Sequence, residues 1–140
     1  MKRYFGLIGL CGVLLLGGCM TQANQQADAT MIVQQMHAAI HTQSLDAAME
    51  LYGDDFFASQ TRQAWREKLA SLQERFGELR EVKSVFSQKN PRLGGDFYVS
   101  GYKLIFERGV VHETLTVFKK NGEDRLMVTG HLFKFKDDVL

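Results

Sequence analysis

The stretch "HETLTVFKKNGEDRLMVTGH", residues 112–131, contains two runs of alternating apolar and polar residues with a turn between them. Asn121-Gly122 is the strongest hairpin signal in the chain, because both residues accept the positive φ angles of a tight two-residue turn. The runs beside it predict antiparallel strands over residues 110–119 and 126–135. This hairpin decides the fold class, since the rest of the chain must then pack against a sheet.

Two more strands are predicted upstream of the hairpin. Residues 97–107 are rich in aromatic and branched side chains, and Arg108-Gly109 can turn the chain into the next strand. Residues 82–87 form a further strand, and "NPRLGG", residues 90–95, holds the only proline and a glycine pair and is interpreted as a loop. The second half of the chain is therefore expected to be a meander of four antiparallel strands.

Before Gly77 the apolar residues recur at helical spacing. Ile32, Met36 and Ile40 form one face of a helix that Asp28 can cap, and Ser44 can cap a second, shorter helix. Trp65, with three further apolar residues at helical spacing, predicts a third helix that ends at Gly77. The order predicts a single α+β domain over residues 28–140, with three N-terminal helices packed on a four-stranded antiparallel sheet.

The N-terminus has the layout of a secretory signal. Lys2 and Arg3 precede an uncharged run to Gly18, which is too short and too rich in glycine for a membrane-spanning helix of about 20 residues. We expect residues 1–18 to be a cleaved signal peptide. The polar segment 19–27 is then expected to be a flexible linker that carries the cysteine at its start.

The four residues Leu16-Gly17-Gly18-Cys19 resemble the lipobox of bacterial lipoproteins. This resemblance implies that Cys19 becomes the first residue and is acylated on its sulfur and its amine, so that the protein is anchored to a membrane of the cell envelope. Met20 after the cysteine implies the outer membrane, facing the periplasm. The alternatives for Cys19 are a buried apolar residue or a disulfide with Cys11, which lies inside the cleaved segment.

Charge and motifs exclude several functions. The chain has 17 Lys and Arg against 16 Asp and Glu, and without Lys2 and Arg3 the formal net charge is −1, so no basic surface for nucleic acid is expected. The sequence contains no G-x-S-x-G motif, no P-loop and no dinucleotide fingerprint. No cofactor is therefore expected.

Two-residue turns at both hairpins would place an acidic residue on the apolar face of the sheet. In that register Glu113 lies opposite Gly130 on the face that we assign to the helices. A β-bulge would shift the pairing by one residue and invert the assignment.

A carboxylate in a pocket between the helices and the sheet could orient a ligand or abstract a proton. The predicted ligand-binding set is Tyr98, Tyr102, Glu113 and Trp65. The alternatives are an ion pair with a helix arginine or a solvated glutamate at the mouth of the fold.

The opposite face of the predicted sheet is also apolar. Its side chains include Val99, Ile105, Phe118 and Phe133. Because this face is too apolar to remain in water, it predicts a surface that a partner covers. The alternative is that the chain end, residues 133–140, folds over part of it.

The histidines form two candidate pairs for a metal. His37 and His41 are four residues apart on the first helix, and His112 and His131 are expected to be neighbours on the outer sheet face. Neither pair has an evident third ligand, and Thr116 stands where an H-E-x-x-H motif that begins at His112 needs its second histidine. We therefore predict no metal site.

Three segments carry a resemblance to a known family: "FGELREV" (76–82), "YVSGYKLIF" (98–106) and the hairpin quoted above. Together with the element order they resemble uncharacterised exported bacterial domains of the nuclear transport factor 2-like, cystatin-like type. The resemblance implies a curved, cone-like sheet, an open end that often forms a pocket, and dimers formed through the sheet. Leu126 and His131 depart from the aromatic residues of that pattern.

These observations support three hypotheses of function. The first is a membrane-anchored lipoprotein that acts as a small binding or protein-interaction module in the cell envelope, with an unknown small ligand. The second is a small cone-fold enzyme of the isomerase or dehydratase type, with Glu113 as general base and Tyr102 as hydrogen-bond donor. A structural role in envelope assembly is a third possibility.

Overall fold

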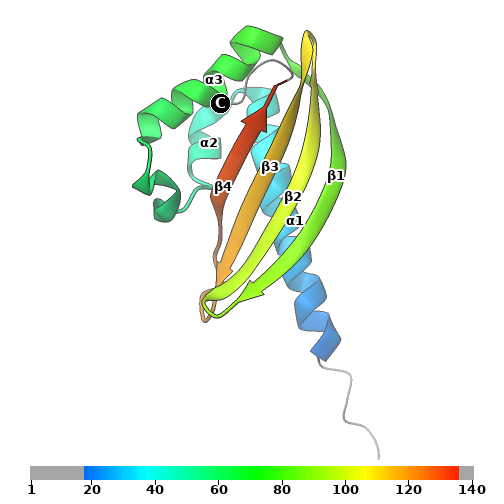
Figure 1. Ribbon diagram of the computed structural model, residues 1–140, viewed down its shortest axis with the longest axis vertical. Helices are drawn as coiled ribbons and strands as arrows, with labels where there is room; N and C mark the ends of the chain where they lie inside the picture. Colours follow the sequence, from blue (N-terminus) through cyan, green and yellow to red (C-terminus); the bar gives the residue numbers. More distant parts are fainter. Residues whose placement is uncertain (1–17, 136–140) are drawn as a thin grey trace, which may run out of the picture.

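The computed structural model describes the backbone of residues 18–135 and the side chains of residues 24–135. Most of the predicted signal peptide and the side chain of Cys19 lie outside the described residues. The elements are α1 (Gly18–Thr42), α2 (Leu45–Met49), a short 3-10 helix η1 (Asp54–Ala58), α3 (Arg62–Phe76), β1 (Leu79–Arg92), β2 (Gly95–Phe106), β3 (Gly109–Lys120) and β4 (Leu126–Lys134). The strands form one antiparallel sheet in the order β1-β2-β3-β4 (Figure 1). The predicted α+β class is confirmed.

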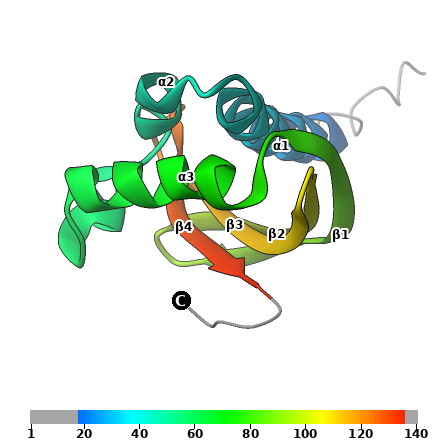
Figure 2. The same cartoon turned by 90° about the horizontal axis from the view of Figure 1, so that it is seen from above.

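The helices lie on one side of the curved sheet (Figure 2). α1 buries Met36 and Ile40 against the strands, as its apolar spacing predicts, but Val33 is buried with them in place of Ile32, which is half-buried. α3 begins where the Thr61 hydroxyl accepts a hydrogen bond from the amide of Ala64, and it ends at Gly77, whose φ of 81° favours glycine. These caps position Trp65 on the buried face of α3.

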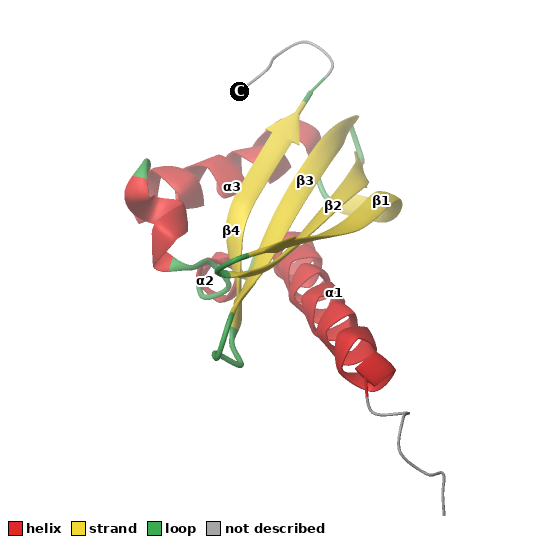
Figure 3. Cartoon of the chain, turned by 60° about the horizontal axis from the view of Figure 1, so that its bottom comes forward, coloured by secondary structure: helices red, strands yellow, loops and turns green. Residues whose placement is uncertain are grey.

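α1 begins earlier than the sequence indicates. It starts at Gly18, before the expected cap at Asp28, so the segment 19–27 that we expected to be a flexible linker belongs to the helix. The segment contains three Gln and two Ala and neither Gly nor Pro, so its composition is compatible with a helix. The first turns of α1 extend beyond the end of the sheet (Figure 3). Within the described part of the chain, no helix is long and apolar enough to cross a membrane.

The β1–β2 and β2–β3 turns differ from the predicted positions without changing the faces. β1 continues through Asn90 and Pro91 to Arg92, so only Leu93 and Gly94 connect it to β2. Phe106 pairs with Gly109, which shifts the β2–β3 register by two residues from the prediction. Because side chains alternate with a period of two, such a shift leaves every side chain on its predicted face.

The β3–β4 pairing contains a bulge that the predicted register lacks. Near the turn Val117 pairs with Val128, but Thr116 pairs with Gly130, so Thr129 is an extra residue in β4. Beyond the bulge His131 and Phe133 point toward the helices, and each is at most 3% exposed. The predictions that His131 and Phe133 lie on the outer face are therefore wrong.

The outer face keeps part of its predicted apolar character. Val99, Ile105 and Phe118 are half-buried there, while Leu132 takes the outward position in β4 and is 57% exposed. Phe135, directly after β4, has its ring centroid 5.2 Å from that of Phe76 of α3.

Candidate functional site

Glu113 on the inner face of β3 is the centre of a buried hydrogen-bonded network. Its Oε1 atom lies 2.7 Å from Nε2 of His131 in β4, and its Oε2 atom lies 2.5 Å from Nε2 of His37 in α1. Glu113 as a whole residue is 2% exposed. Both carboxylate oxygens are thus occupied by imidazole nitrogens from two different elements.

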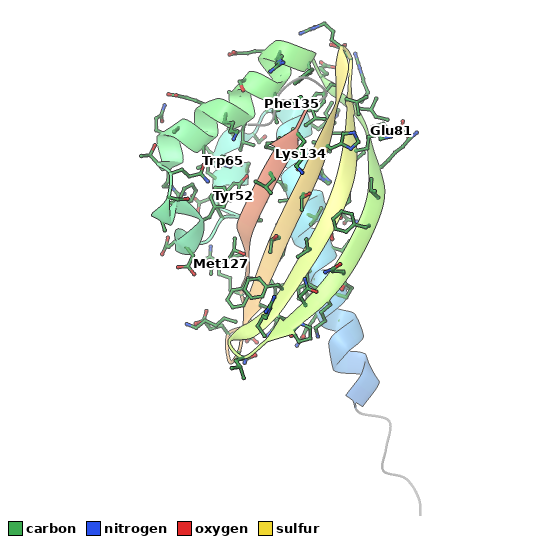
Figure 4. All side chains as sticks on the ribbon, in the orientation of Figure 1. Tyr52, Trp65, Glu81, Met127, Lys134 and Phe135 are labelled. Carbon is green, nitrogen blue, oxygen red and sulfur yellow. The ribbon has the colours of Figure 1, made fainter. Side chains whose placement is uncertain are left out.

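The network continues from His131 into the core. The hydroxyl of Tyr52 lies 2.6 Å from Nδ1 of His131, and it also lies 3.7 Å from the Sδ atom of Met36. The rings of Trp65 and Phe133 flank His131, with centroids 5.5 and 4.3 Å from its own. Tyr52 and Trp65 lie beside each other next to β4 (Figure 4). His131 is therefore enclosed on the side away from Glu113.

The protonation of the network follows from burial and hydrogen bonding. Burial alone would raise the pKa of Glu113, but the hydrogen bonds from His131 and His37, together with the positive charge that these rings carry when they are protonated, outweigh it and lower the pKa to about 2. Burial raises the pKa of Tyr52 well above its ordinary value, so its hydroxyl keeps its proton. Since an ionised carboxylate only accepts, Nε2 of each histidine must donate to Glu113. Tyr52 can then donate to the free Nδ1 of a neutral His131.

A groove of about 490 Å³ opens beside His37, between α1 and the strands β1 and β2. Its lining is made of small polar, aliphatic and aromatic side chains from those three elements: Thr30, Val33, Gln34, His37, Val82, Ser84, Ser87 and Tyr102. The ring centroids of His37 and Tyr102 are 4.7 Å apart, in an edge-to-face arrangement. Glu113 does not line the groove. His37 therefore connects the buried carboxylate with the groove.

The structure brings together two of the four predicted ligand-binding residues. Tyr102 and Glu113 are direct partners across β2 and β3. Tyr98 is buried, and its hydroxyl donates to Oε1 of Gln25 at 3.3 Å. Trp65 lies in the core, and neither Tyr98 nor Trp65 lines the groove. The partners of Glu113 are histidines, instead of the helix arginine or the solvent that the alternative hypotheses offered.

The sequence reasoning missed the three other members of the network: Tyr52, His37 and His131. His37 was considered only with His41, but His41 bonds to the carbonyl oxygen of Leu79 at 2.9 Å, so the two imidazoles serve different partners. His112 and His131 lie on opposite faces of the sheet. No group of three or more potential metal ligands occurs in the part of the chain that the structure describes.

Comparison with known proteins identifies the type of fold. No family model and no curated protein sequence matches the chain. Among solved structures, a Nostoc punctiforme protein of unknown function with a cystatin-like fold matches 84% of this chain and 95% of its own, with a TM-score of 0.62 and 9% identity. A Thiobacillus denitrificans protein described as a calcium/calmodulin-dependent protein kinase type II association domain matches 74% and 91%, with a TM-score of 0.53 and 18% identity.

Bd1075 of Bdellovibrio bacteriovorus is a third similar structure. It has a TM-score of 0.62 and 10% identity over 84% of this chain, which spans only 43% of Bd1075. At these identities the similarity extends to the fold alone. The chain has a fold of the cystatin-like, nuclear transport factor 2-like type, and its function must be argued from its own residues.

Proposed function

We propose that this protein is a membrane-anchored binding module of the cell envelope, and that a small ligand occupies the groove beside His37. The observation that carries the proposal is the position of the His37 imidazole. Its Nε2 atom contacts the buried, ionised carboxylate of Glu113, and its side chain lines a groove of about 490 Å³. Ligand sites are typically apolar clefts with a few polar groups held in fixed positions. Val33, Val82 and Tyr102 supply the apolar walls of the groove, and His37 supplies the fixed polar group.

The anchor in this proposal is the lipid on Cys19. The lipobox-like residues 16–19 support it, and Met20 favours the outer membrane, facing the periplasm. Because α1 runs from Gly18 to Thr42, a rise of 1.5 Å per residue puts Thr30, at the edge of the groove, about 17 Å along the helix from Cys19. The groove would then be close to the membrane surface.

Two experiments test the parts of the proposal separately. Cys19→Ser should abolish labelling by a radioactive fatty acid and release the protein from the membrane fraction, whereas Cys11→Ser should leave both unchanged. Labelling that persists in Cys19→Ser would exclude the lipid anchor. Native mass spectrometry of the protein purified from its host should show a retained small molecule, and the groove-filling variant Ser84→Trp should lose it.

A homodimer through the outer sheet face is a second part of the proposal. The apolar surface formed by Val99, Ile105 and Phe118 supports it, and Leu132 replaces Phe133 in this set. Ile105→Glu should turn a dimer into a folded monomer in light scattering. A wild-type protein that is monomeric at high concentration would remove this part of the proposal and leave the groove unaffected.

A small enzyme of the isomerase or dehydratase type is the alternative function. Its supporting observation is the contact between Glu113 and His37 next to Tyr102. Both oxygens of Glu113 are occupied and the side chain is buried, so His37 would contact the substrate in such an enzyme, with Tyr102 as hydrogen-bond donor. Glu113 would then act through His37 as a positioning residue. Turnover of a carbonyl substrate that is lost in His37→Gln would favour this alternative.

A further inference from the structure

The carboxylate of Glu113 determines the tautomer of His37. Glu113 is ionised and can only accept, so Nε2 of His37 carries the hydrogen that points to Oε2. In a neutral imidazole the other nitrogen is then an acceptor. No described residue forms a hydrogen bond with Nδ1 of His37. The ring therefore presents a lone pair that the described chain does not use, in a side chain that lines the groove.

The charges around the groove favour an uncharged ligand. Among the described residues that line it, none is Lys, Arg, Asp or Glu. An anion could pair only with a protonated His37, whose charge Glu113 already balances at 2.5 Å. A cation would find no carboxylate oxygen within the groove, because both oxygens of Glu113 are engaged. Neither an anion nor a cation would therefore find an unpaired opposite charge in the groove.

We propose that the groove recognises an uncharged ligand that donates an O–H or N–H hydrogen bond to Nδ1 of His37 and packs a flat apolar body against Val33, Val82 and Tyr102. This inference rests on the proposed binding function and names the class of ligand. Glu113 contributes as a positioning residue, because its carboxylate keeps the hydrogen on Nε2 and leaves Nδ1 as the acceptor. The hydroxyl of Ser84 is available to a further polar group of the ligand, whereas Thr30 already donates to the carbonyl oxygen of Gln26 and Ser87 accepts from Ser100.

The groups around His37 come from all four strands. Glu113 of β3 and Tyr102 of β2 contact His37, and His131 of β4 also contacts the carboxylate of Glu113. The residues of β1 that line the groove are Val82, Ser84 and Ser87, which are not ionisable near neutral pH. When His37 is protonated, Nδ1 becomes a donor. Only the neutral ring can therefore accept a hydrogen bond from the ligand.

Three probes with the same ring separate the possible ligand classes. We would titrate the purified full chain, labelled with [¹⁵N]histidine, with 4-fluorophenol, 4-fluoroanisole and 4-fluorobenzoate, and follow Nδ1 of His37 by long-range ¹H–¹⁵N correlation. The phenol donates a hydrogen bond, the anisole does not, and the benzoate is an anion. We expect the phenol to bind about three- to tenfold more tightly than the anisole, which corresponds to one net hydrogen bond, and the benzoate to bind most weakly.

The same spectra report the tautomer before any probe is added. We expect neutral His37 to carry its hydrogen on Nε2, and Glu113→Gln to shift this population and to reduce the preference for the phenol. A hydrogen on Nδ1 in the wild-type protein, or tighter binding of the benzoate, would overturn the inference. Absence of phenol binding would also overturn it.

The matched groove variant separates this inference from the proposed function. Ser84 is exposed at the groove and outside the network, so Ser84→Trp should block every probe while leaving the tautomer of His37 unchanged. Equal binding of phenol and anisole that Ser84→Trp abolishes would remove the donor requirement and keep the groove as a ligand site. Probe shifts that survive Ser84→Trp, together with no retained ligand in native mass spectrometry, would remove both.

Discussion

Nε2 of His131 lies 2.7 Å from Oε1 of Glu113, although the two residues are not direct partners across β3 and β4. Glu113 pairs with Phe133, and His131 pairs with Leu115. The contact exists because the extra residue Thr129 reverses which side chains of β4 face the helices from Gly130 onward, so that His131 faces the helices. The bulge thus creates half of the candidate site.

Substitutions at two adjacent residues test the bulge directly. Leu132 is 57% exposed and Phe133 is 1% exposed. Phe133→Glu should unfold the protein or destabilise it by about 3 kcal/mol or more, since it removes a buried aromatic ring and buries a charge. Leu132→Glu should stay within about 0.5 kcal/mol of wild type in urea unfolding, because it lies on the surface. A larger loss of stability for Leu132→Glu than for Phe133→Glu would mean that β4 has the unbulged register.

Glu113→Gln tests the energetic role of the network. Glutamine has the shape of glutamate, but it replaces one charged acceptor oxygen with a donor that meets the N–H of a histidine. We expect a loss of about 1.5–3 kcal/mol, the cost of hydrogen bonds to a charged group, and a melting temperature lower by about 5–15 °C for a domain of this size. Glu81→Gln is the matched control, because the side chain of Glu81 is 55% exposed. An unchanged melting temperature for Glu113→Gln would show that the network does not stabilise the fold.

The acid stability of the protein should also depend on Glu113. Its pKa in the folded protein is about 2, below the ordinary value of 4.5. The unfolded chain therefore binds more protons between these values, and the stabilisation, on the order of 3 kcal/mol, is present above pH 4.5 and is lost as the pH falls toward 2. Denaturant unfolding should show a steeper loss between pH 5 and 2 for wild type than for Glu113→Gln. The same dependence of the unfolding free energy on pH in both proteins would contradict the lowered pKa of Glu113.

The turn between β1 and β2 offers a prediction with an adjacent control. Gly95 has a φ of 155°, and a Cβ atom there would lie 2.2 Å from the carbonyl oxygen of Lys119. Gly95→Ala should therefore cost about 1–3 kcal/mol, as strained backbone positions do. A Cβ atom at Gly94 would meet nothing within 4 Å, so Gly94→Ala should be nearly neutral in thermal melts. Equal effects at both positions would mean that the turn has a different geometry.

The sequence by itself determined the class of fold. The change from helical to alternating spacing at Gly77 and the Asn121-Gly122 turn predict three helices followed by four antiparallel strands, because these periods reflect which side chains a helix or a strand can bury together. It also indicated that Glu113 faces the helices, with Tyr102 on the same face. These features depend on local spacing, which a shift of two residues in register does not alter.

The partners of Glu113 were decided only by the tertiary structure. Residues 37 and 113 are 76 positions apart, and no local pattern relates α1 to β3. The bulge at Thr129 inverts β4 from Gly130 onward, and neither Thr nor Gly at this point distinguishes a bulged strand from a regular one before the strands pair. His131 therefore looked like a surface residue in the alternating pattern. Packing of Tyr52 and Trp65 against β4 favours the inward orientation, since it fills the core around the imidazole.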